Sequence, residues 1–472
     1  MEQWKPVRAL LISTYDLGRQ PFGLASPAAW LRRAGVDVEC VDTSRDPLRD
    51  DQLASAGLIA FYLPMHTATR LAAPLLARVS ASNPGATVAA YGLYAPLNAA
   101  WLKERGVTHV LGPEAEADLL ALAGGQQLPS SEFRIPRLQL IQPDRSSLPP
   151  LSRYAALQMP DGTRRVVGNS EATRGCKHLC RHCPIVPVYR GAFRAVPVDV
   201  VLDDVRAQIA AGAQHISFGD PDFFNGPAHA RRVLERFARE CRGVTFDATI
   251  KIEHLLKHVD LLPLLRDSGC LFVTTAVESV DDAVLGKLRK GHTRADFIDA
   301  VGRCREAGIT LSPSFVPFTP WTTLEGYVDL LDQIAALDLI GSVAPIQLAI
   351  RLLVTADSAL LELPDLRELV QPFDGGSLTW PWRHADPRVD ALQQDVMRLV
   401  GTMQRAPRRE AFDRIAALAR DRAGSSGSAR ADRVPAHGAG PTPPYLTEAW
   451  YCCAEPAAAD VSAGEPGSLD YV

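Results

Sequence analysis

The stretch GNSEATRGCKHLCRHCP, residues 168–184, decides how this chain is interpreted. It overlaps the predicted strand RRVVGNSEAT and, just after it, places Cys176, Cys180 and Cys183 in the spacing C-x3-C-x2-C. Three thiolates in one short loop can hold three irons of a [4Fe–4S] cluster, whereas a closed electron-transfer cluster takes four thiolates. The loop therefore predicts a cluster with one iron open to a further ligand.

This spacing resembles the signature of the radical S-adenosylmethionine (SAM) enzymes. The resemblance implies two cofactors, a [4Fe–4S] cluster on the three cysteines and SAM on the open iron. It also implies an activity in which the reduced cluster cleaves SAM to a 5'-deoxyadenosyl radical that acts on a substrate. An electron donor such as a flavodoxin or ferredoxin would supply the electron. The residue before the last cysteine is usually aromatic in that family and is His182 here.

A zinc site is the alternative for the same loop. His178 and His182 lie between the cysteines, so Cys3His ligation is chemically available. Structural zinc usually takes two short ligand pairs that are far apart in sequence, and no second pair follows here. The spacing favours the iron–sulfur interpretation.

Length and composition indicate a large globular protein. At 472 residues the chain exceeds one ordinary core, so two or three domains are expected. The net charge is −4 and no basic tract occurs, which argues against a nucleic-acid partner. No apolar stretch approaches roughly 18 residues and no export signal is present, so we expect no membrane partner and a cytoplasmic location.

Residues 1–125 alternate strand-like and helix-like runs, which predicts a doubly wound parallel sheet of the flavodoxin or Rossmann type. The strand-like runs are VRALLIST, VDVECVD, LIAFYLP, ATVAAYG and VTHVLG. The domain resembles the cobalamin-binding domain that precedes many radical SAM cores. Its first loop reads TYDLGRQPFG and lacks the D-x-H-x-x-G motif that supplies an axial histidine. We therefore expect any cobalamin to bind without a histidine of this domain, and cobalamin counts as a doubtful cofactor.

The rest of the chain divides by composition into four parts. Residues 126–164 are a Pro-, Ser- and Arg-rich connector, and residues 165–355 resume the βα alternation. Six strand-like runs in that region, ending with VAPIQLAI, predict a partial (β/α)6 barrel of the TIM type, as the resemblance also implies. Residues 356–423 are predicted to form a helical C-terminal extension, and residues 424–472 a flexible linker and tail.

Polar residues at the strand ends are the candidates for binding SAM, because βα barrels place their active sites there. The second barrel strand ends SFGDPDFF, with Gly219, Asp220 and Asp222. The resemblance assigns a glycine-rich acidic motif at this point to the SAM amino group. The alternative is structural, since Asp-Pro-Asp is also a good turn and helix N-cap.

The fourth barrel strand ends with Glu278 and Ser279, in a V-E-S segment that resembles cobalamin-type radical SAM proteins. A carboxylate and a hydroxyl at this point suit the ribose hydroxyls of SAM. Later strands offer Lys251, Ser314 and Gln347, which are more often structural polar groups than ligands. Arg174, just before the cysteine loop, is predicted to meet either the SAM carboxylate or the charge of the cluster.

The tail carries two adjacent cysteines, Cys452 and Cys453, in the sequence YCCAEP. This closely resembles the radical SAM proteins named for a CUAEP or CCAEP tail, some of which carry selenocysteine at the position of Cys453. Adjacent Cα atoms lie about 3.8 Å apart, below the disulfide range of about 4.4–6.8 Å, so a mutual bridge would be strained and easily reduced. A flexible linker of about 20 residues reaches about 25 Å, enough to approach the barrel mouth. We predict a catalytic redox or atom-transfer role; the alternative is a disordered end with incidental cysteines.

These observations predict a radical SAM enzyme that acts on an unknown substrate. A cobalamin-dependent radical SAM methyltransferase is the alternative enzyme. A non-enzymatic iron–sulfur or zinc sensor is the alternative of a different class. The remaining cysteines Cys40, Cys241, Cys270 and Cys304 lie in apolar patterns and are predicted to be inert core residues.

Overall fold

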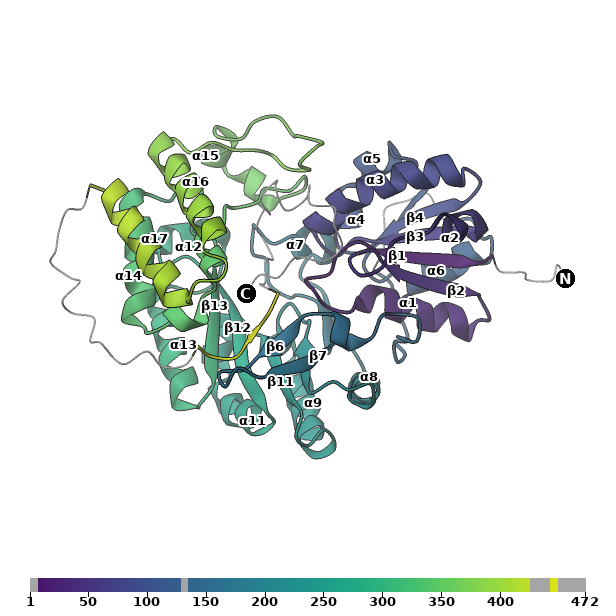
Figure 1. The fold of residues 1–472 in the computed structure, drawn as a ribbon, viewed down its shortest axis with the longest axis horizontal. Coiled ribbons are helices and arrows are strands. Elements are labelled where there is room, and N and C mark those ends of the chain that lie inside the picture. Colours follow the sequence, from purple (N-terminus) through teal and green to yellow (C-terminus); the bar gives the residue numbers. More distant parts are fainter. Residues whose placement is uncertain (1–6, 129–134, 425–441, 449–472) are drawn as a thin grey trace.

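The computed structural model of the protein describes residues 7–128, 135–424 and 442–448. An N-terminal α/β domain and a larger domain built on a curled sheet lie side by side (Figure 1). The predicted tail residues Cys452 and Cys453 lie outside the described residues. Within the described part of the chain, no helix combines the length and the apolar content needed to cross a membrane.

Five parallel strands form the N-terminal sheet in the order β2-β1-β3-β4-β5, which is the flavodoxin-like order. Residues of β1 lie between β2 and β3, with Ala9 opposite both Val38 and Leu58. The strands are apolar along their length because helices cover both faces. The predicted doubly wound sheet is confirmed. Its strands are β1 (Ala9–Ser13), β2 (Val38–Asp42), β3 (Leu58–Tyr62), β4 (Thr87–Tyr91) and β5 (His109–Val110).

Two groups of helices pack on this sheet. Leu31 of the first helix and Leu119 of the sixth share one apolar cluster with the sheet, whereas Leu76 and Val79 of the third helix belong to the cluster on the other face. The helices are α1 (Phe22–Arg33), α2 (Asp50–Ser55), α3 (His66–Ser82), α4 (Tyr94–Leu97), α5 (Ala99–Lys103) and α6 (Glu116–Ala123).

Seven strands form the second sheet in the order β13-β12-β11-β10-β7-β6-β14. The five strands from β7 to β13 are parallel, whereas β6 and β14 are antiparallel to their neighbours. A separate hairpin pairs β8 with β9. The strands are β6 (Ala156–Gln158), β7 (Arg164–Ser170), β8 (Thr173–Gly175), β9 (Phe193–Ala195), β10 (His215–Phe218), β11 (Thr245–Thr249), β12 (Cys270–Glu278), β13 (Thr310–Phe315) and β14 (Tyr445–Leu446).

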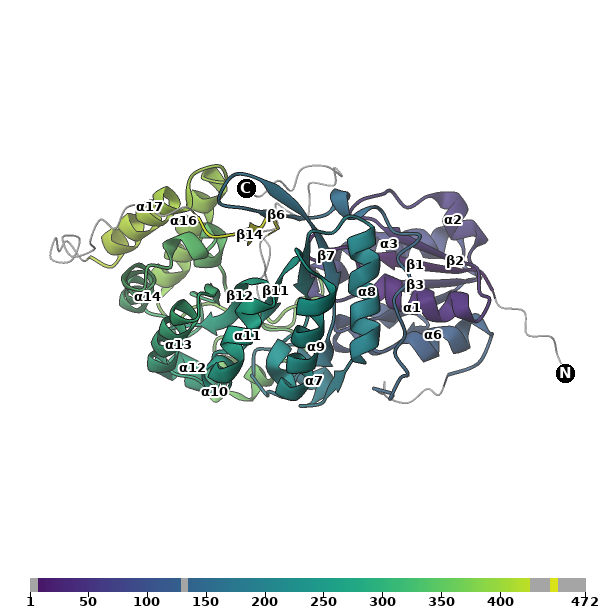
Figure 2. The same ribbon diagram turned by 90° about the horizontal axis from the view of Figure 1, so that it is seen from below.

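Helices line the outer face of this curled sheet, and Figure 2 shows α8, α9, α11, α13 and α14 along it. Val273 and Val277 of β12 point into the core under these helices. Side chains alternate along a strand, so Phe272 and Thr274 face the other way, into the lumen. The helices of this part are α7 (Ile185–Tyr189), α8 (Val198–Ala210), α9 (Pro227–Glu240), α10 (Ile252–Lys257), α11 (Leu262–Asp267), α12 (Asp282–Leu288), α13 (Arg294–Glu306) and α14 (Leu324–Ala336).

The partial barrel predicted from the sequence is confirmed, with one difference. The run VAPIQLAI, predicted as the sixth strand, contains the short 3-10 helix η5 (Pro345–Leu348) instead. Pro345 has no N–H to give to a ladder, and within the described ranges a single parallel bridge, Phe318 to Arg351, continues the sheet beyond β13. The other 3-10 helices are η1 (Leu151–Arg153), η2 (Phe223–Asn225), η3 (Val259–Leu261), η4 (Ile340–Ser342) and η6 (Ala359–Glu362).

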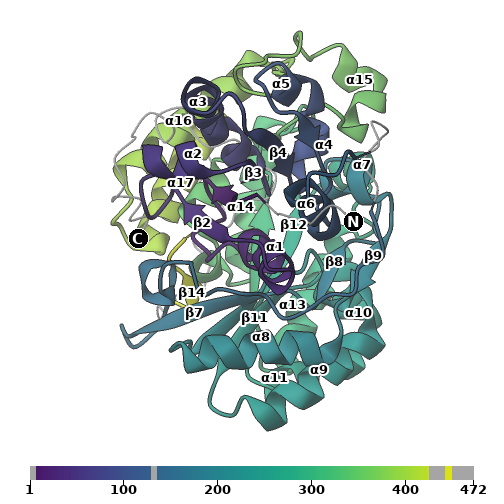
Figure 3. The ribbon, with the colours of Figure 1, turned by 90° about the vertical axis from the view of Figure 1, so that its right-hand side faces the viewer.

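The C-terminal part packs two long helices on the barrel and returns one strand to its far edge. The apolar side chains of Val396 and Ile415, one from each helix, belong to the main core. Tyr445 and Leu446 then pair with β6, so β14 extends the sheet at the edge opposite β13. Figure 3, with the N-terminal domain in front, shows β14 close to β7. The helices are α15 (Pro364–Arg367), α16 (Pro387–Thr402) and α17 (Arg408–Arg422).

Candidate functional site

The cysteine loop lies at the carboxyl ends of the parallel strands, where βα barrels carry their active sites. Cys176 follows β8 directly, and Gly175 before it has a φ of 74°. A Cβ on Gly175 would lie 2.3 Å from the ring of Tyr189, so only glycine suits this turn. Asn225 holds the loop from the side, because its amide donates to the Gly175 carbonyl at 3.1 Å and accepts from the Lys177 N–H at 3.2 Å.

The arrangement of the three thiols fits a cluster of several irons. Cys176 and Cys180 are buried and Cys183 is partly exposed. Among the described residues, the three sulfur atoms do not gather within 4.8 Å of one another. Thiolates on one tetrahedral zinc would lie about 3.8 Å apart. A four-iron cluster, in which each thiolate binds a different iron, suits the wider spacing.

Both histidines of the loop are turned toward carboxylates. His178 Nε2 lies 3.4 Å from Asp222 Oδ2, and His182 Nε2 lies 3.1 Å from Glu278 Oε1. Each imidazole of the loop is thus oriented by a protein carboxylate in this structure.

The electrostatic surroundings suit an anionic, thiolate-ligated group. Lys251, at the end of β11, places its Nζ 3.8 Å from Cys180 Sγ. Burial raises the pKa of the Cys176 thiol to about 11. A bound metal centre deprotonates such thiols, and the nearby ammonium offsets part of the charge that this creates.

The three predicted residues at the end of β10 have different surroundings. Asp220 accepts hydrogen bonds from Ala172 N at 2.9 Å and from Thr173 Oγ1 at 2.6 Å, so it anchors the start of the cysteine loop. Burial raises the pKa of Asp220 to about 6. Gly219 is partly exposed, and a Cβ there would lie 3.2 Å from the buried Asn169 Oδ1.

Asp222 caps the 3-10 helix η2 and contacts two histidines. Its Oδ1 accepts from Phe224 N at 3.2 Å, which is the capping role left open by the sequence. Its Oδ2 lies 2.6 Å from His254 Nδ1. Burial alone would raise the pKa of Asp222, but His178 and His254 lower it to about 2. Through its contact with His178, Asp222 therefore helps to fix the position of the cysteine loop.

Glu278 and Ser279 lie together at the end of β12. Glu278 has a φ of 68° and is 5% exposed, and its Oε1 accepts from Lys290 Nζ at 3.2 Å and contacts His182. Burial alone would raise the pKa of Glu278, but Lys290 and His182 lower it to about 2. Ser279 Oγ accepts from Asp281 N at 3.1 Å, and Asp281 caps α12.

Arg174 lies at the boundary between the two domains. Its Nη1 lies 2.7 Å from Glu116 Oε1 of α6, its Nη2 donates to Ser26 Oγ at 3.0 Å, and its Nε lies 3.2 Å from Glu171 Oε2. Phe22 lies under the guanidinium at 5.5 Å. The guanidinium is thus engaged by protein carboxylates, and the two roles predicted for Arg174 stay predictions.

Two residues near Gly219 were not found from the sequence. Arg19, in the loop after β1, brings its Nη1 within 3.5 Å of the position that a Gly219 Cβ would take. Its guanidinium makes no hydrogen bond or ion pair with a described residue. Asn169 Oδ1 is buried without a hydrogen-bond partner among the described residues. Both residues lie near Gly219 because the fold brings distant parts of the chain together. No local sequence pattern therefore indicates that they belong to the site.

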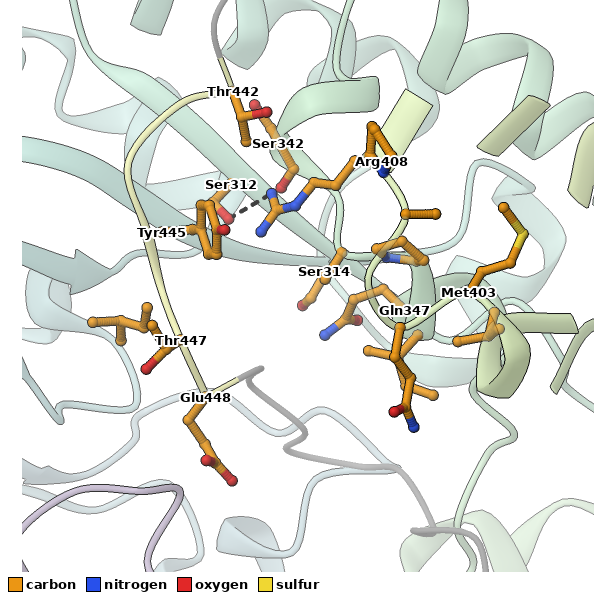
Figure 4. Close-up of a pocket in the computed structure, with 18 of the residues that line it drawn as sticks. Ser312, Ser314, Ser342, Gln347, Met403, Arg408, Thr442, Tyr445, Thr447 and Glu448 are labelled. Carbon is orange, nitrogen blue, oxygen red and sulfur yellow. Dashed lines mark hydrogen bonds between the residues drawn. The ribbon is translucent and has the colours of Figure 1, made fainter. Parts of the chain in front are cut away.

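The lumen of the curled sheet holds a cavity of about 580 Å³. Its wall combines the inner face of β12 and β13 with the segment after η4, the corner between α16 and α17, and β14 (Figure 4). Ser314 and Gln347, both sequence candidates, line it. A second cavity, of about 160 Å³, lies between the domains and is lined by Tyr62, Tyr91 and Arg174 among others.

The four cysteines predicted to be inert are all buried, in agreement with the prediction. Burial raises the pKa of Cys40 and of Cys241 to about 11, and that of Cys304 to about 12. These thiols are therefore protonated at neutral pH and poor nucleophiles.

Sequence comparisons match part of the chain to known enzymes. A bacteriochlorophyllide d C-12(1)-methyltransferase from Chlorobaculum tepidum is 32% identical over 133 residues, which is 28% of each chain. The ribosomal protein uS12 methylthiotransferase RimO from Parabacteroides distasonis is 25% identical over 166 residues, 33% of this chain and 38% of that protein. The chain thus spans less than half the length of these relatives.

Comparison of structures matches both domains. The cobalamin-dependent SAM radical enzyme OxsB, with aqua-cobalamin and SAM bound, has a TM-score of 0.67 at 13% identity and covers 88% of this chain and 71% of its own. The radical SAM methyltransferase TsrM from Kitasatospora setae, with cobalamin and a [4Fe–4S] cluster bound, has a TM-score of 0.55 at 18% identity and covers 70% of this chain and 73% of its own. These likenesses show a shared fold.

The family model described as the radical SAM superfamily matches residues 170–334, a range that contains the cysteine loop and the strands from β10 to β13. Residues 170–334 are therefore a radical SAM superfamily domain.

Proposed function

We propose that the protein cleaves SAM reductively at a [4Fe–4S] cluster and uses the resulting radical on a substrate bound in the lumen. The observation that supports this most is the loop of three thiols at the strand ends, inside the matched domain. Cys176, Cys180 and Cys183 would hold three irons of the cluster. When bound and reduced, the cluster supplies the electron that breaks the SAM sulfonium bond.

The ends of β10 and β12 would hold SAM. The accessible backbone at Gly219 and the unpartnered Asn169 Oδ1 suit the ammonium group, and the guanidinium of Arg19 suits the carboxylate. Glu278 and Ser279 would lie on the ribose side. Asp220 and Asp222 would act through the cysteine loop, since protein groups already engage both carboxylates.

Iron and product analysis test this proposal. Anaerobically reconstituted protein should bind about four irons per chain, and the reduced protein should convert SAM to 5'-deoxyadenosine. Cys176→Ala should lose both, whereas Cys304→Ala, a buried cysteine far from the loop in sequence, should keep both. Stoichiometric zinc without iron uptake would overturn the proposal.

Cobalamin-dependent methyl transfer is the second candidate function. The shared two-domain fold supports it, because OxsB and TsrM are described with cobalamin bound, and it makes cobalamin a plausible cofactor rather than a doubtful one. The cavity between the domains, about 160 Å³ in this structure, is small for a corrin ring. Binding would therefore require side chains such as Tyr62 and Tyr91 to move.

Spectroscopy separates the two candidates. Protein incubated with hydroxocobalamin and passed through a desalting column should retain the corrin spectrum if the second candidate holds. The first loop of the domain offers no histidine, so bound cob(II)alamin should show no superhyperfine splitting from a protein nitrogen. Loss of the corrin on the column, with SAM cleavage intact, would leave only the first function.

Cys452 and Cys453 would serve this chemistry as a redox or atom-transfer pair. Glu448, four positions before Cys452, lines the lumen cavity, and four extended residues span at most about 14 Å. The double variant Cys452→Ser/Cys453→Ser should keep its iron and its SAM cleavage without substrate. It should lose most of the extra 5'-deoxyadenosine formation that a small-molecule extract of the source cells elicits from the wild type. An unchanged response would remove the tail from the mechanism.

A further inference from the structure

The lumen cavity has the size and the lining of a small-molecule site. Its volume of about 580 Å³ falls inside the range of about 300–1,000 Å³ that is usual for ligand pockets. Figure 4 shows polar side chains from separate elements in its wall, among them Ser314, Gln347 and Arg408. These groups come from β13, η5 and α17.

Arg408 is a partly buried cation in this wall, and it has no anionic partner among the described residues. Its Nη1 donates to the Gly341 carbonyl at 2.7 Å, and its guanidinium lies 4.2 Å from the centre of the Tyr445 ring. No carboxylate of a described residue forms an ion pair with it. Burial lowers the pKa of Arg408, and Tyr445 opposes this effect. Charged side chains removed from water are normally paired with an opposite charge. The guanidinium of Arg408 is therefore suited to bind an anionic group of a ligand.

Other features near Arg408 point the same way. Arg408 is the first residue of α17, and the capping residue Pro407 makes no side-chain hydrogen bond to the helix. The positive end of the helix dipole therefore adds to the charge of the guanidinium. Arg398, also in the wall, is engaged by Asp395, whereas Arg405 is solvent-exposed.

The remaining polar groups limit the charge of the anion. Glu448 lies at another point of the wall (Figure 4) and accepts a hydrogen bond from Tyr15. A carboxylate in the same cavity disfavours a doubly charged ligand group such as a phosphate monoester. Of the Arg408 nitrogens, Nη1 donates to Gly341, and Nε and Nη2 have no acceptor among the described residues. A guanidinium binds a planar, singly charged carboxylate well.

The cavity also leads toward the cysteine loop. Ser314 lines it, and its Oγ is buried without a hydrogen-bond partner among the described residues. Ser314 pairs with Ala276 in the register of the sheet, and the next pair is Phe315 with Glu278. Glu278 in turn contacts His182 of the cysteine loop. With a rise of about 3.3 Å per residue, a molecule of moderate size can reach from Arg408 to the strand ends.

We propose that this cavity binds a small organic carboxylate, with its carboxylate group on Arg408 and a polar group on Ser314. This inference deepens the proposed function and rests on it, because the ligand would be the substrate of the radical reaction. Arg408 anchors the end of the molecule that does not react.

A paired compound library tests the ligand class. Each carboxylic acid, of up to about 20 heavy atoms, is screened next to its primary amide and the corresponding phosphate monoester, with the melting temperature of the full-length holoprotein as readout. We expect acids that bind the wild type at least tenfold more tightly than their amides. Absence of any binding acid, equal binding of acid and amide, or preference for phosphate monoesters would overturn the proposal.

Variants then test the anchor. Arg408→Met should weaken binding of the selected acids at least tenfold and leave binding of the amides unchanged. Arg420→Met makes the same change on an exposed position of α17 and should bind acids within twofold of the wild type. Tyr445→Leu removes the ring under the guanidinium but keeps the charge, so it should retain the preference for acids even if Arg408→Met does not fold. Acid binding that persists in a folded Arg408→Met protein would contradict the assignment.

A separate readout keeps this inference apart from the proposed function. Formation of 5'-deoxyadenosine by the reduced protein without substrate does not involve Arg408, so Arg408→Met should retain it. If neither protein cleaves SAM while acids still bind through Arg408, the proposed function fails and the cavity assignment stands. If SAM cleavage is intact and acids show no dependence on Arg408, the reverse holds.

Discussion

The ion pair between Arg174 and Glu116 joins the two domains, and its removal should destabilise the whole molecule. Arg174 Nη1 lies 2.7 Å from Glu116 Oε1, and the two side chains are 9% and 2% exposed. Ser26 Oγ donates to the same carboxylate oxygen at 2.7 Å. The nearest alternative partner of Arg174 is Glu171, whose side chain is 22% exposed.

The size of the effect follows from burial. Removing one partner of a buried ion pair costs about 3–5 kcal/mol, because the other charge stays out of water. Unfolding about 400 ordered residues with about 2.1 cal/mol/K each gives an entropy of about 0.8 kcal/mol/K, so this loss lowers the melting temperature by about 4–6 °C. Glu116→Gln should lie at the lower end, since Glu171 remains beside Arg174. Arg174→Met should lie at the upper end, since it leaves two carboxylates together.

Calorimetry with a matched control checks this reasoning. Arg420→Met breaks an exposed pair with Asp332, with side chains 44% and 41% exposed, and should cost at most about 1 kcal/mol. The double variant Glu116→Leu/Arg174→Met should recover most of the loss, because apolar groups replace a buried pair at little cost. Two outcomes would refute the assignment of a buried, energetically coupled pair. The single variants could lose no more stability than the Arg420→Met control, or the loss in the double variant could equal the sum of the losses in the two single variants.

Three further results are expected. Gly175→Ala should lose iron and lower the melting temperature more than Gly162→Ala, because both positions have positive φ but only Gly175 meets a ring and a carbonyl. Burial raises the pKa of Asp16 to about 7 although the charge of Arg19 opposes this, so the folded chain holds a proton that the unfolded chain releases. Stability should therefore fall as pH rises from about 4 to 7, and Asp16→Asn should flatten that slope in melting curves. Lys251→Met should lower iron retention after gel filtration severalfold relative to Lys257→Met, because Lys251 faces a thiol of the loop and Lys257 is exposed.

Much of the fold could be predicted from the sequence because both sheets are covered by helices. Strands buried on both faces leave continuous apolar runs such as LIAFYLP and CLFVTTAV, and these became β3 and β12. The run VAPIQLAI has the same composition but contains a proline where a ladder needs a donor, and it formed η5. Apolar content alone could not separate the two outcomes.

The candidate site could be predicted where its signal is local. The cysteine spacing marks the loop because all three ligands come from one short segment. The sequence does not identify Arg19 and Arg408 as site residues, because neither belongs to a recognisable motif. Their significance comes from neighbours in other elements, Gly219 for the first and Tyr445 for the second. Contacts between residues so far apart along the chain cannot be predicted from a single sequence.

The position of β14 determines when the lumen is completed during synthesis. Thr447 Oγ1 accepts from Ala156 N across 291 residues of sequence, so this pairing joins the start of the second domain to nearly the last described residues. Until residues 442–448 have left the ribosome, β6 is a free sheet edge and the cavity lacks one of its walls. Contacts of such long range close loops of high entropic cost and form late. The lumen therefore lacks this wall until β14 has been synthesised, and we expect β14 to pair with β6 late in folding.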